Sequence, residues 1–459
     1  MPSEVAAFLC FTFILAALIL DIRQKPNVSS ALWIPLIWLI IGASRSLSLW
    51  VYGLSGYSGV SQSSVDSIEE GSAIDRNFLI IMIILGIYVL LKRKVKWALF
   101  FRENKWVIFL YIVCVVSLLW SDFPYVAFKR WIKGFGVLLM STIVLTEHDR
   151  LEALKTIVKR CAYILIPLSI LLVKYYRNLG VFYDEYGAVL AGVATGKNSL
   201  GLLCAICGIF FVWYISTEWR DQHKAKLFYQ QGLIINIIIM MMIFLLFNIA
   251  NSATSLICFI IGVITYMVLG LPLLKNNQKE FRLWFTLIII FSLPIILITY
   301  DAFAPSVIEH TGHGNTFWDR VKLWNLLLTM DTSPLFGAGY DSFWLGERLK
   351  KLRSIYWWSP TQAHNGYLDV YLELGLIGLF FWAGVIFYAF RNVYRTLSFD
   401  YDFGRFQMAF MTMFLMHNVT ESSLKIRSFL WFIFLLIILY YPQRLTSSKS
   451  QGIPEGSAG

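Results

Sequence analysis

The chain has 459 residues, of which 58% are hydrophobic, 17% aromatic and only 15% charged. A mean hydropathy of +0.65 is far above what a water-soluble domain exposes, so the composition excludes a soluble globular protein. The formal net charge is +11, but the basic residues are spread over short loops and form no contiguous groove with stacking aromatics, which argues against nucleic-acid binding.

Apolar runs long enough to cross a hydrocarbon core of about 30 Å recur along the whole chain. The run 232–249 is apolar on every face, which favours helices over the alternating strands of a membrane barrel. The run 5–20 has no basic region before it and no small-residue cleavage site after it, so we predict a retained helix. We predict an all-α polytopic integral membrane protein with about 12–13 transmembrane helices. The expected spans are 5–20, 31–50, 77–91, 106–120, 134–146, 161–174, 198–215, 232–250, 254–272, 283–300, 368–390, 406–419 and 428–442.

The distribution of Lys and Arg predicts the orientation, because cytoplasmic loops retain positive charge during insertion. With the N-terminus outside, the cytoplasmic loops and tail carry 23 Lys and Arg against 11 Asp and Glu, and the remainder is nearly neutral. We therefore expect an external N-terminus and a cytoplasmic C-terminus. The expected parts are an N-terminal transmembrane bundle (1–300), an extracytoplasmic loop (301–367), C-terminal transmembrane helices (368–442) and a cytoplasmic tail (443–459).

Two polar stretches are long enough to do more than connect helices. The stretch 53–72 is rich in Ser and Gly and predicts a flexible external loop. The stretch 301–367 is the only soluble-sized segment, and its apolar residues argue against disorder. Those at 318, 321, 323, 324, 327 and 328 place an apolar face on a short helix that should end before Pro334. FGAGYDSFW then predicts a Gly-rich turn into a second helix, and we expect the loop to fold against the outer mouth of the bundle.

Several basic residues lie on the side that the insertion rule keeps poor in positive charge. Single residues of this kind commonly snorkel or pair with lipid headgroups. As a set, however, they supply the Arg forks and Lys point charges that a diphosphate requires, and a lipid diphosphate would lie at this depth. The set comprises Lys129, Arg130, Lys133, Arg177, Lys197, Arg320 and Lys322.

His364 stands in the stretch QAHNGYLD, just before a predicted apolar helix, with Asn365 and Asp369 able to orient it. Because imidazole titrates near neutral pH, a histidine here is a natural general base for a hydroxyl group. A capping or interfacial histidine is the alternative. The aromatic run 356–358, Tyr-Trp-Trp, is suited either to stacking on sugar faces or to an interfacial aromatic belt.

The remaining histidines and the cysteines give weaker indications of a functional site. His310 and His313 have a spacing that zinc sites use, but no Cys or carboxylate completes a ligand set, so we predict no metal. We interpret His417 as a polar contact inside a helix. Cys204 and Cys207 lie within one apolar run, and all six cysteines look like packing residues. The sequence has no Gly-rich phosphate loop, paired DxD carboxylates or nucleophile elbow, which argues against nucleotide hydrolysis and nucleotide-sugar chemistry.

Several stretches, in order over most of the chain, resemble the O-antigen ligase and polysaccharide polymerase superfamily, in particular its succinoglycan-type exopolysaccharide polymerases. They are GSAIDRNFL at 71–79, SLLWSDFPYVAFKRWIKG at 117–134, GVATGKNSLG at 192–201, DRVKLWNLLL at 319–328, SPLFGAGYDSFW at 333–344, AHNGYLDVYLELGLIGL at 363–379 and TESSLKIRSFLW at 420–431. The strength of the match lies in their order and in the HN motif at the end of the long external loop.

The resemblance implies an inverting glycosyl transfer at the outer face of the bacterial inner membrane, from a sugar chain on undecaprenyl diphosphate to an acceptor hydroxyl, without metal, nucleotide or other cofactor. By position, His364 would activate the acceptor hydroxyl, and Arg320 and Lys197 would hold the diphosphate. Arg130 is a less direct member of this set. We add the external Arg177 to the diphosphate candidates and Asn198 to the supporting residues. This chain has Asp319 where the family commonly has Gly, and that carboxylate could pair with Arg320.

Three function classes therefore stand side by side. The first is a polymerase of lipid-linked repeats, or a ligase that transfers the polymer to a lipid core. The second is a flippase for the same lipid, which would show inverted repeats and ionisable residues in mid-span, and the predicted spans show neither. The third, a scaffolding membrane protein, leaves the external basic residues and His364 unexplained. The expected partners are lipid-linked oligosaccharide and membrane lipid, with a chain-length regulator and export machinery as further candidates.

Overall fold

The computed structural model describes residues 1–24, 26–54, 71–184, 187–221, 227–272, 314–356 and 358–441. Within these ranges the regular structure is helical except for one antiparallel hairpin, β1 (Val181–Asp184) with β2 (Gly187–Leu190). Six helices of this described part are long and apolar enough to cross a membrane, so the predicted all-α polytopic membrane fold is confirmed. They are α1 (Ser3–Arg23), α5 (Ala73–Lys92), α9 (Arg150–Tyr175), α11 (Lys197–Asp221), α12 (Leu227–Ala250) and α18 (Gly366–Phe399).

The remaining predicted spans coincide with shorter or less apolar helices, except 283–300, which lies outside the described residues. The span 31–50 is broken into two helices that meet at an angle of 65°. The total of 12–13 transmembrane helices stays a prediction. These helices are α2 (Trp33–Ala43), α3 (Leu47–Leu54), α7 (Lys105–Val116), α8 (Pro124–Leu145), α13 (Ala253–Val268), α19 (Tyr401–Thr420) and α20 (Phe429–Ile438).

Helix α9 begins at Arg150, eleven residues before the predicted span, because the Asp149 side chain caps its first turn. Lys159 and Arg160, which the sequence assigned to a cytoplasmic loop, therefore lie inside the helix. Both ion pair with Asp21 of α1 at 2.6 Å, and all three side chains are buried. The expectation that the chain carries no ionisable residues within its spans is wrong here, since a carboxylate from a second helix supplies the counter-charge.

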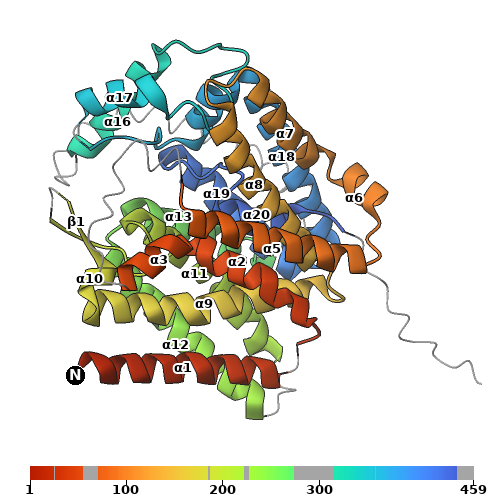
Figure 1. Ribbon diagram of the computed structural model, residues 1–459. Coiled ribbons are helices and arrows are strands. Elements are labelled where there is room, and N and C mark those ends of the chain that lie inside the picture. The colour runs from red at the N-terminus through yellow and green to blue at the C-terminus, as the bar shows by residue number, and fades with distance from the viewer. Residues whose placement is uncertain are drawn as a thin grey trace, which may run out of the picture.

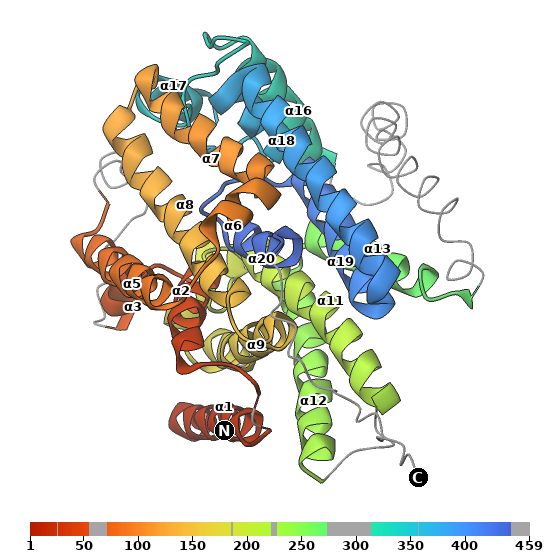
Figure 2. The same cartoon turned by 90° about the vertical axis from the view of Figure 1, so that its right-hand side faces the viewer.

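Figures 1 and 2 place α1 at one edge of the molecule, beside α9 and α12. At the opposite edge lie α16 (Gly314–Leu328) and α17 (Gly346–Ile355), over the ends of α7, α8 and α18. Helix α20 lies between these edges, and every residue from Leu430 to Ile438 is buried. Because α20 is buried on all sides, its sequence is apolar on every face of the helix.

Helices α16 and α17 carry the folded part of the long polar segment, and their positions confirm the predicted helix before Pro334 and the second helix after the Gly-rich turn. Their apolar faces build a small core with Leu372 of α18. The members of this core are Leu323, Leu327, Met330, Ala338, Phe343, Trp344, Leu352, Ala363 and Leu372.

Helix α18 is interrupted at Gly375, whose φ is +63°, and the Gly-rich turn forms hydrogen bonds with the helix at this point. There Ala338 N–H donates to Leu372 C=O at 2.9 Å, and Leu376 N–H donates to Pro334 C=O at 3.0 Å. A Cβ on Gly375 would lie 2.3 Å from the carbonyl carbon of Leu335, so only glycine fits. The break thereby holds the polar segment against the start of α18.

Candidate active site

His364 lies immediately before α18, and hydrogen bonds of the neighbouring residues fix the position of its backbone. It adopts a left-handed conformation with φ of +50°, and Asn365 is the N-cap of the helix. The Asn365 side chain accepts from two N–H groups of the first turn, and the backbone N–H of Asn365 donates to Ser422 Oγ at 3.1 Å. Asp369 accepts from Ala363 N–H at 3.1 Å. Asn365 and Asp369 thus fix the chain on either side of His364, but neither contacts the imidazole.

The imidazole of His364 is oriented by Glu421, at the end of α19. The distance from Nδ1 of His364 to Oε2 of Glu421 is 3.1 Å. The other carboxylate oxygen accepts from Asn198 at 2.7 Å and from Arg320 at 3.2 Å. Arg320 also donates to Thr420 C=O at 2.6 Å. Three residues selected from the sequence therefore meet on one carboxylate, contributed from α11, α16 and the start of α18.

Glu421 is buried, and two effects on the pKa of its carboxyl oppose each other. Burial raises the pKa, whereas the hydrogen bond from His364 and the charge of Arg320 lower it, and the net direction is down. Glu421 is thus ionised and can only accept hydrogen bonds. Glu421 can therefore accept a proton donated by Nδ1 of His364, and in the neutral tautomer that makes this bond Nε2 carries the lone pair that a general base needs.

Glu421 was missed in the sequence, although it lies in the TESS stretch that supported the family resemblance. The usable signal was a lone carboxylate directly after an apolar span, where an unpaired charge is costly.

A second ion-pair cluster surrounds Asp341, in the Gly-rich turn before α17. Arg427 Nε lies 2.5 Å from Asp341 Oδ2, and Arg130 donates to Asp341 C=O at 2.6 Å. The Asp341 side chain is 3% exposed. Burial raises the pKa of this carboxyl, but the charges of Arg427 and Arg130 outweigh it and hold the pKa well below its usual range. Arg130 thus lies in a different cluster from His364.

The remaining predicted cations lie outside both clusters. Lys197 is the first residue of α11, and its side chain is exposed beside Asn198. Arg177 is exposed on α10 (Arg177–Gly180), and Lys322 is exposed on α16. Lys129 lies over the ring of Tyr125, at 4.8 Å from its centroid. The Asp319 side chain, Trp357, His310 and His313 lie outside what the structure describes.

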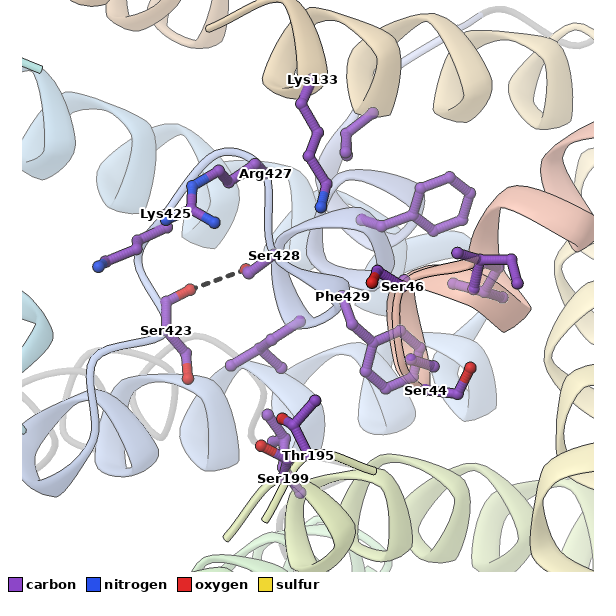
Figure 3. A pocket seen from close by; sticks show the side chains of 18 of the residues that line it. Ser44, Ser46, Lys133, Thr195, Ser199, Ser423, Lys425, Arg427, Ser428 and Phe429 are labelled. Carbon is purple, nitrogen blue, oxygen red and sulfur yellow. Dashed lines mark hydrogen bonds between the residues drawn. The ribbon is translucent and has the colours of Figure 1, made fainter. Parts of the chain in front are cut away.

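Beside the Glu421 cluster is a cavity of about 530 Å³, which we call the Lys133 cavity after the ammonium group that points into it (Figure 3). Glu421 and Gln362 line this cavity, and both also contact Nδ1 of His364. The walls come from α2, α3, α5, α8, α11, α19, α20 and the segment 421–428. Glu421 and Gln362 therefore stand between this cavity and the imidazole of His364.

The structure agrees with the roles predicted for the cysteines and for His417. All six cysteines are free, and Cys204 and Cys207 are buried. His417 is buried in α19, with Nδ1 at 3.4 Å from Ser423 Oγ.

Residues 235–383 match the family model described as O-antigen ligase. This part of the chain is similar to the O-antigen ligase family. The resemblance to the superfamily is thereby confirmed, whereas its succinoglycan-type branch stays a prediction. No curated protein and no solved structure matches the chain. The matched residues 235–383 include Arg320 and His364, while their common partner Glu421 follows them in the sequence. The match supports a ligase- or polymerase-type membrane enzyme that acts on lipid-linked sugars.

Proposed function

We propose that this chain is a glycosyltransferase that polymerises or transfers undecaprenyl-diphosphate-linked oligosaccharide repeats at the outer face of the bacterial inner membrane. The supporting observation is that His364, oriented by an ionised Glu421, lies beside a cavity at helix ends that the charge distribution assigns to the outside. The reaction is inverting and needs no metal.

In the proposed reaction, Nε2 of His364 takes the proton of an acceptor sugar hydroxyl. The hydroxyl oxygen attacks the anomeric carbon of the donor, and the bond from that carbon to the diphosphate oxygen breaks on the opposite side. Negative charge then grows on the leaving group, which Arg320 and Lys197 stabilise. The Trp358 ring, 5.8 Å from the His364 ring, offers a face on which a sugar can stack.

The ligase alternative rests on the description of the matched family. A ligase would use the same base and diphosphate contacts, but its acceptor would be a lipid core. The flippase alternative draws on the buried Asp21, Lys159 and Arg160, since ionisable groups inside spans are typical of transporters. These three residues pair with each other, however, and ion pairs between α1 and α9 also explain their burial by a purely structural role.

Extraction of lipid-linked saccharides from a deletion strain separates these functions. We expect single repeats to accumulate on the lipid at the outer face, because an absent polymerase leaves its substrate unused. Full-length chains still on the lipid indicate a ligase. Repeats confined to the cytoplasmic face indicate a flippase and contradict the proposal.

Replacement of Glu421 with glutamine tests how His364 is oriented. The amide retains the shape but loses a charge-assisted hydrogen bond, worth about 1.5–3 kcal/mol. We expect turnover to fall about ten- to a hundredfold, with little change in KM for the acceptor. Glu347→Gln is the control, because that carboxylate is exposed and pairs only across one turn with Lys350. Equal turnover in Glu421→Gln and wild type contradicts the role of Glu421.

A further inference from the structure

A second cavity, of about 650 Å³, lies where several chain segments meet, and we call it the Lys94 cavity. Its lining comes from the loops after α1 and α5, from the loop before α9 and from the end of the chain after α20. The distribution of Lys and Arg assigns these three loops to the cytoplasmic side. In Figure 1, α6 (Trp97–Glu103), which follows the loop after α5, lies on the side of the molecule opposite hairpin strand β1. No described residue lines both the Lys94 cavity and the Lys133 cavity.

Glu147 is the only carboxylate among the described residues that line the Lys94 cavity, and it is already engaged. It is buried, accepts from the backbone N–H and the hydroxyl of Ser29 at 2.8 and 2.7 Å, and forms an ion pair with Arg93. Arg93 also donates to Ile143 C=O at 2.6 Å and to Thr146 Oγ1 at 2.8 Å. This pair joins the three loops and leaves the other cations of the cavity without a counter-charge.

Three lysines supply those cations. Lys92, Lys94 and Lys96 all line the cavity and are exposed. The Lys92 ammonium lies over the Tyr88 ring, 4.5 Å from its centroid. Lys94 and Lys96 form no ion pair with any described residue, so the cavity presents uncompensated positive charge to an anion.

The surface on either side of these lysines is apolar. The last turns of α5 expose Ile84, Tyr88 and Leu91. Helix α6 exposes Trp97 and Phe101, whose rings stack with centroids 5.9 Å apart. Exposed aromatic residues beside a membrane-spanning helix are typical of the interface with lipid headgroups, and basic residues directly after such a helix attract anionic headgroups. A ligand with both a phosphate and acyl chains therefore fits this surface better than a soluble anion.

We propose that the Lys94 cavity binds the phosphate headgroup of an anionic phospholipid of the cytoplasmic leaflet, through Lys92, Lys94 and Lys96. The acyl chains would then lie along the exposed faces of α5 and α6. The insertion rule counts the basic residues of a loop but does not require that they surround a cavity. The inference uses the predicted orientation of the chain, but it is independent of the proposed glycosyl transfer.

Binding of phosphatidylglycerol to the full-length protein in detergent, followed by native mass spectrometry, tests the inference. In the double variant Lys94→Gln, Lys96→Gln we expect the Kd of the first bound lipid to rise about ten- to thirtyfold, because each cation near an anionic headgroup contributes a few-fold. The double variant Arg102→Gln, Lys105→Gln is the matched control. It removes the same charge from the same connection between α5 and α7, but outside the cavity lining, and should change the Kd less than about threefold. Replacement of Lys94 and Lys96 with arginine should preserve the affinity.

Two competitors identify the part of the lipid that is recognised. Phosphatidylcholine has a phosphate but no net charge and should bind at least tenfold more weakly, and equal binding of the two lipids overturns the proposal. Displacement of phosphatidylglycerol by an equal concentration of inorganic phosphate would assign the cavity to a soluble anion and also overturn it. So would an unchanged Kd in the Lys94→Gln, Lys96→Gln variant. His364→Ala should bind phosphatidylglycerol as tightly as wild type, so this result and the result for polymer synthesis are independent of each other.

Discussion

Replacement of His364 with alanine is expected to abolish polymer, while the protein still accumulates in the membrane and lipid-linked single repeats build up. A positioned general base contributes about 10²–10⁴-fold to proton transfer, and no other described imidazole shares the contact with Glu421. The measurement is polymer per unit of membrane protein, together with the amount of lipid-linked repeat.

A second variant separates chemistry from folding. The backbone at His364 has φ of +50°, a conformation that asparagine tolerates better than alanine. His364→Asn should therefore fold at least as well as His364→Ala and be equally inactive. His148→Ala is the control, because that histidine is exposed and its side chain lies 3.3 Å from Asn27, far along the chain from the Glu421 cluster. Undiminished polymer in His364→Asn would remove His364 from the mechanism.

Most of the helical architecture could be predicted from the sequence, because apolar runs of membrane length have few alternatives to a helix. The predicted helix boundaries are wrong where contacts between distant parts of the chain decide the local structure. Helix α9 continues through Lys159 and Arg160 because Asp21, 138 residues before the first of them, supplies a counter-charge. The break of α18 at Gly375 is likewise set by the inserted turn at Leu335 and cannot be read from local propensity.

The candidate site was predicted in part, for a similar reason. His364, Arg320 and Asn198 were found by residue type and position, and they do converge. Glu421, the residue that all three contact, was not predicted. The sequence does not show which residues will lie beside a carboxylate once the helix ends come together. The same holds for Arg130, whose pairing with Asp341 depends on how the Gly-rich turn packs against α8.

Replacement of Asp341 with alanine is expected to lower the free energy of unfolding by about 3–5 kcal/mol, because it leaves two arginines next to each other without their shared counter-charge. Removal of one partner from a buried pair is costly even where the intact pair adds little net stability. Unfolding in detergent by denaturant, followed by tryptophan fluorescence, measures the loss. Asp122→Ala is the control and should cost about 0–1 kcal/mol, because its pair with Arg348 is partly exposed.

Asp341→Asn tests whether the charge or the backbone carries this effect. Asp341 has φ of +52°, which asparagine also tolerates, so a loss of stability in this variant reports the charge alone. The pKa of Asp341 is lowered in the folded protein, so its contribution is complete above the unfolded pKa of about 3.9 and is lost as the pH falls toward the folded value. The stability gap between wild type and Asp341→Asn should therefore be constant from pH 7 to about pH 5 and shrink below about pH 4. A gap that is absent at pH 7 would show that Arg130 and Arg427 do not depend on this carboxylate.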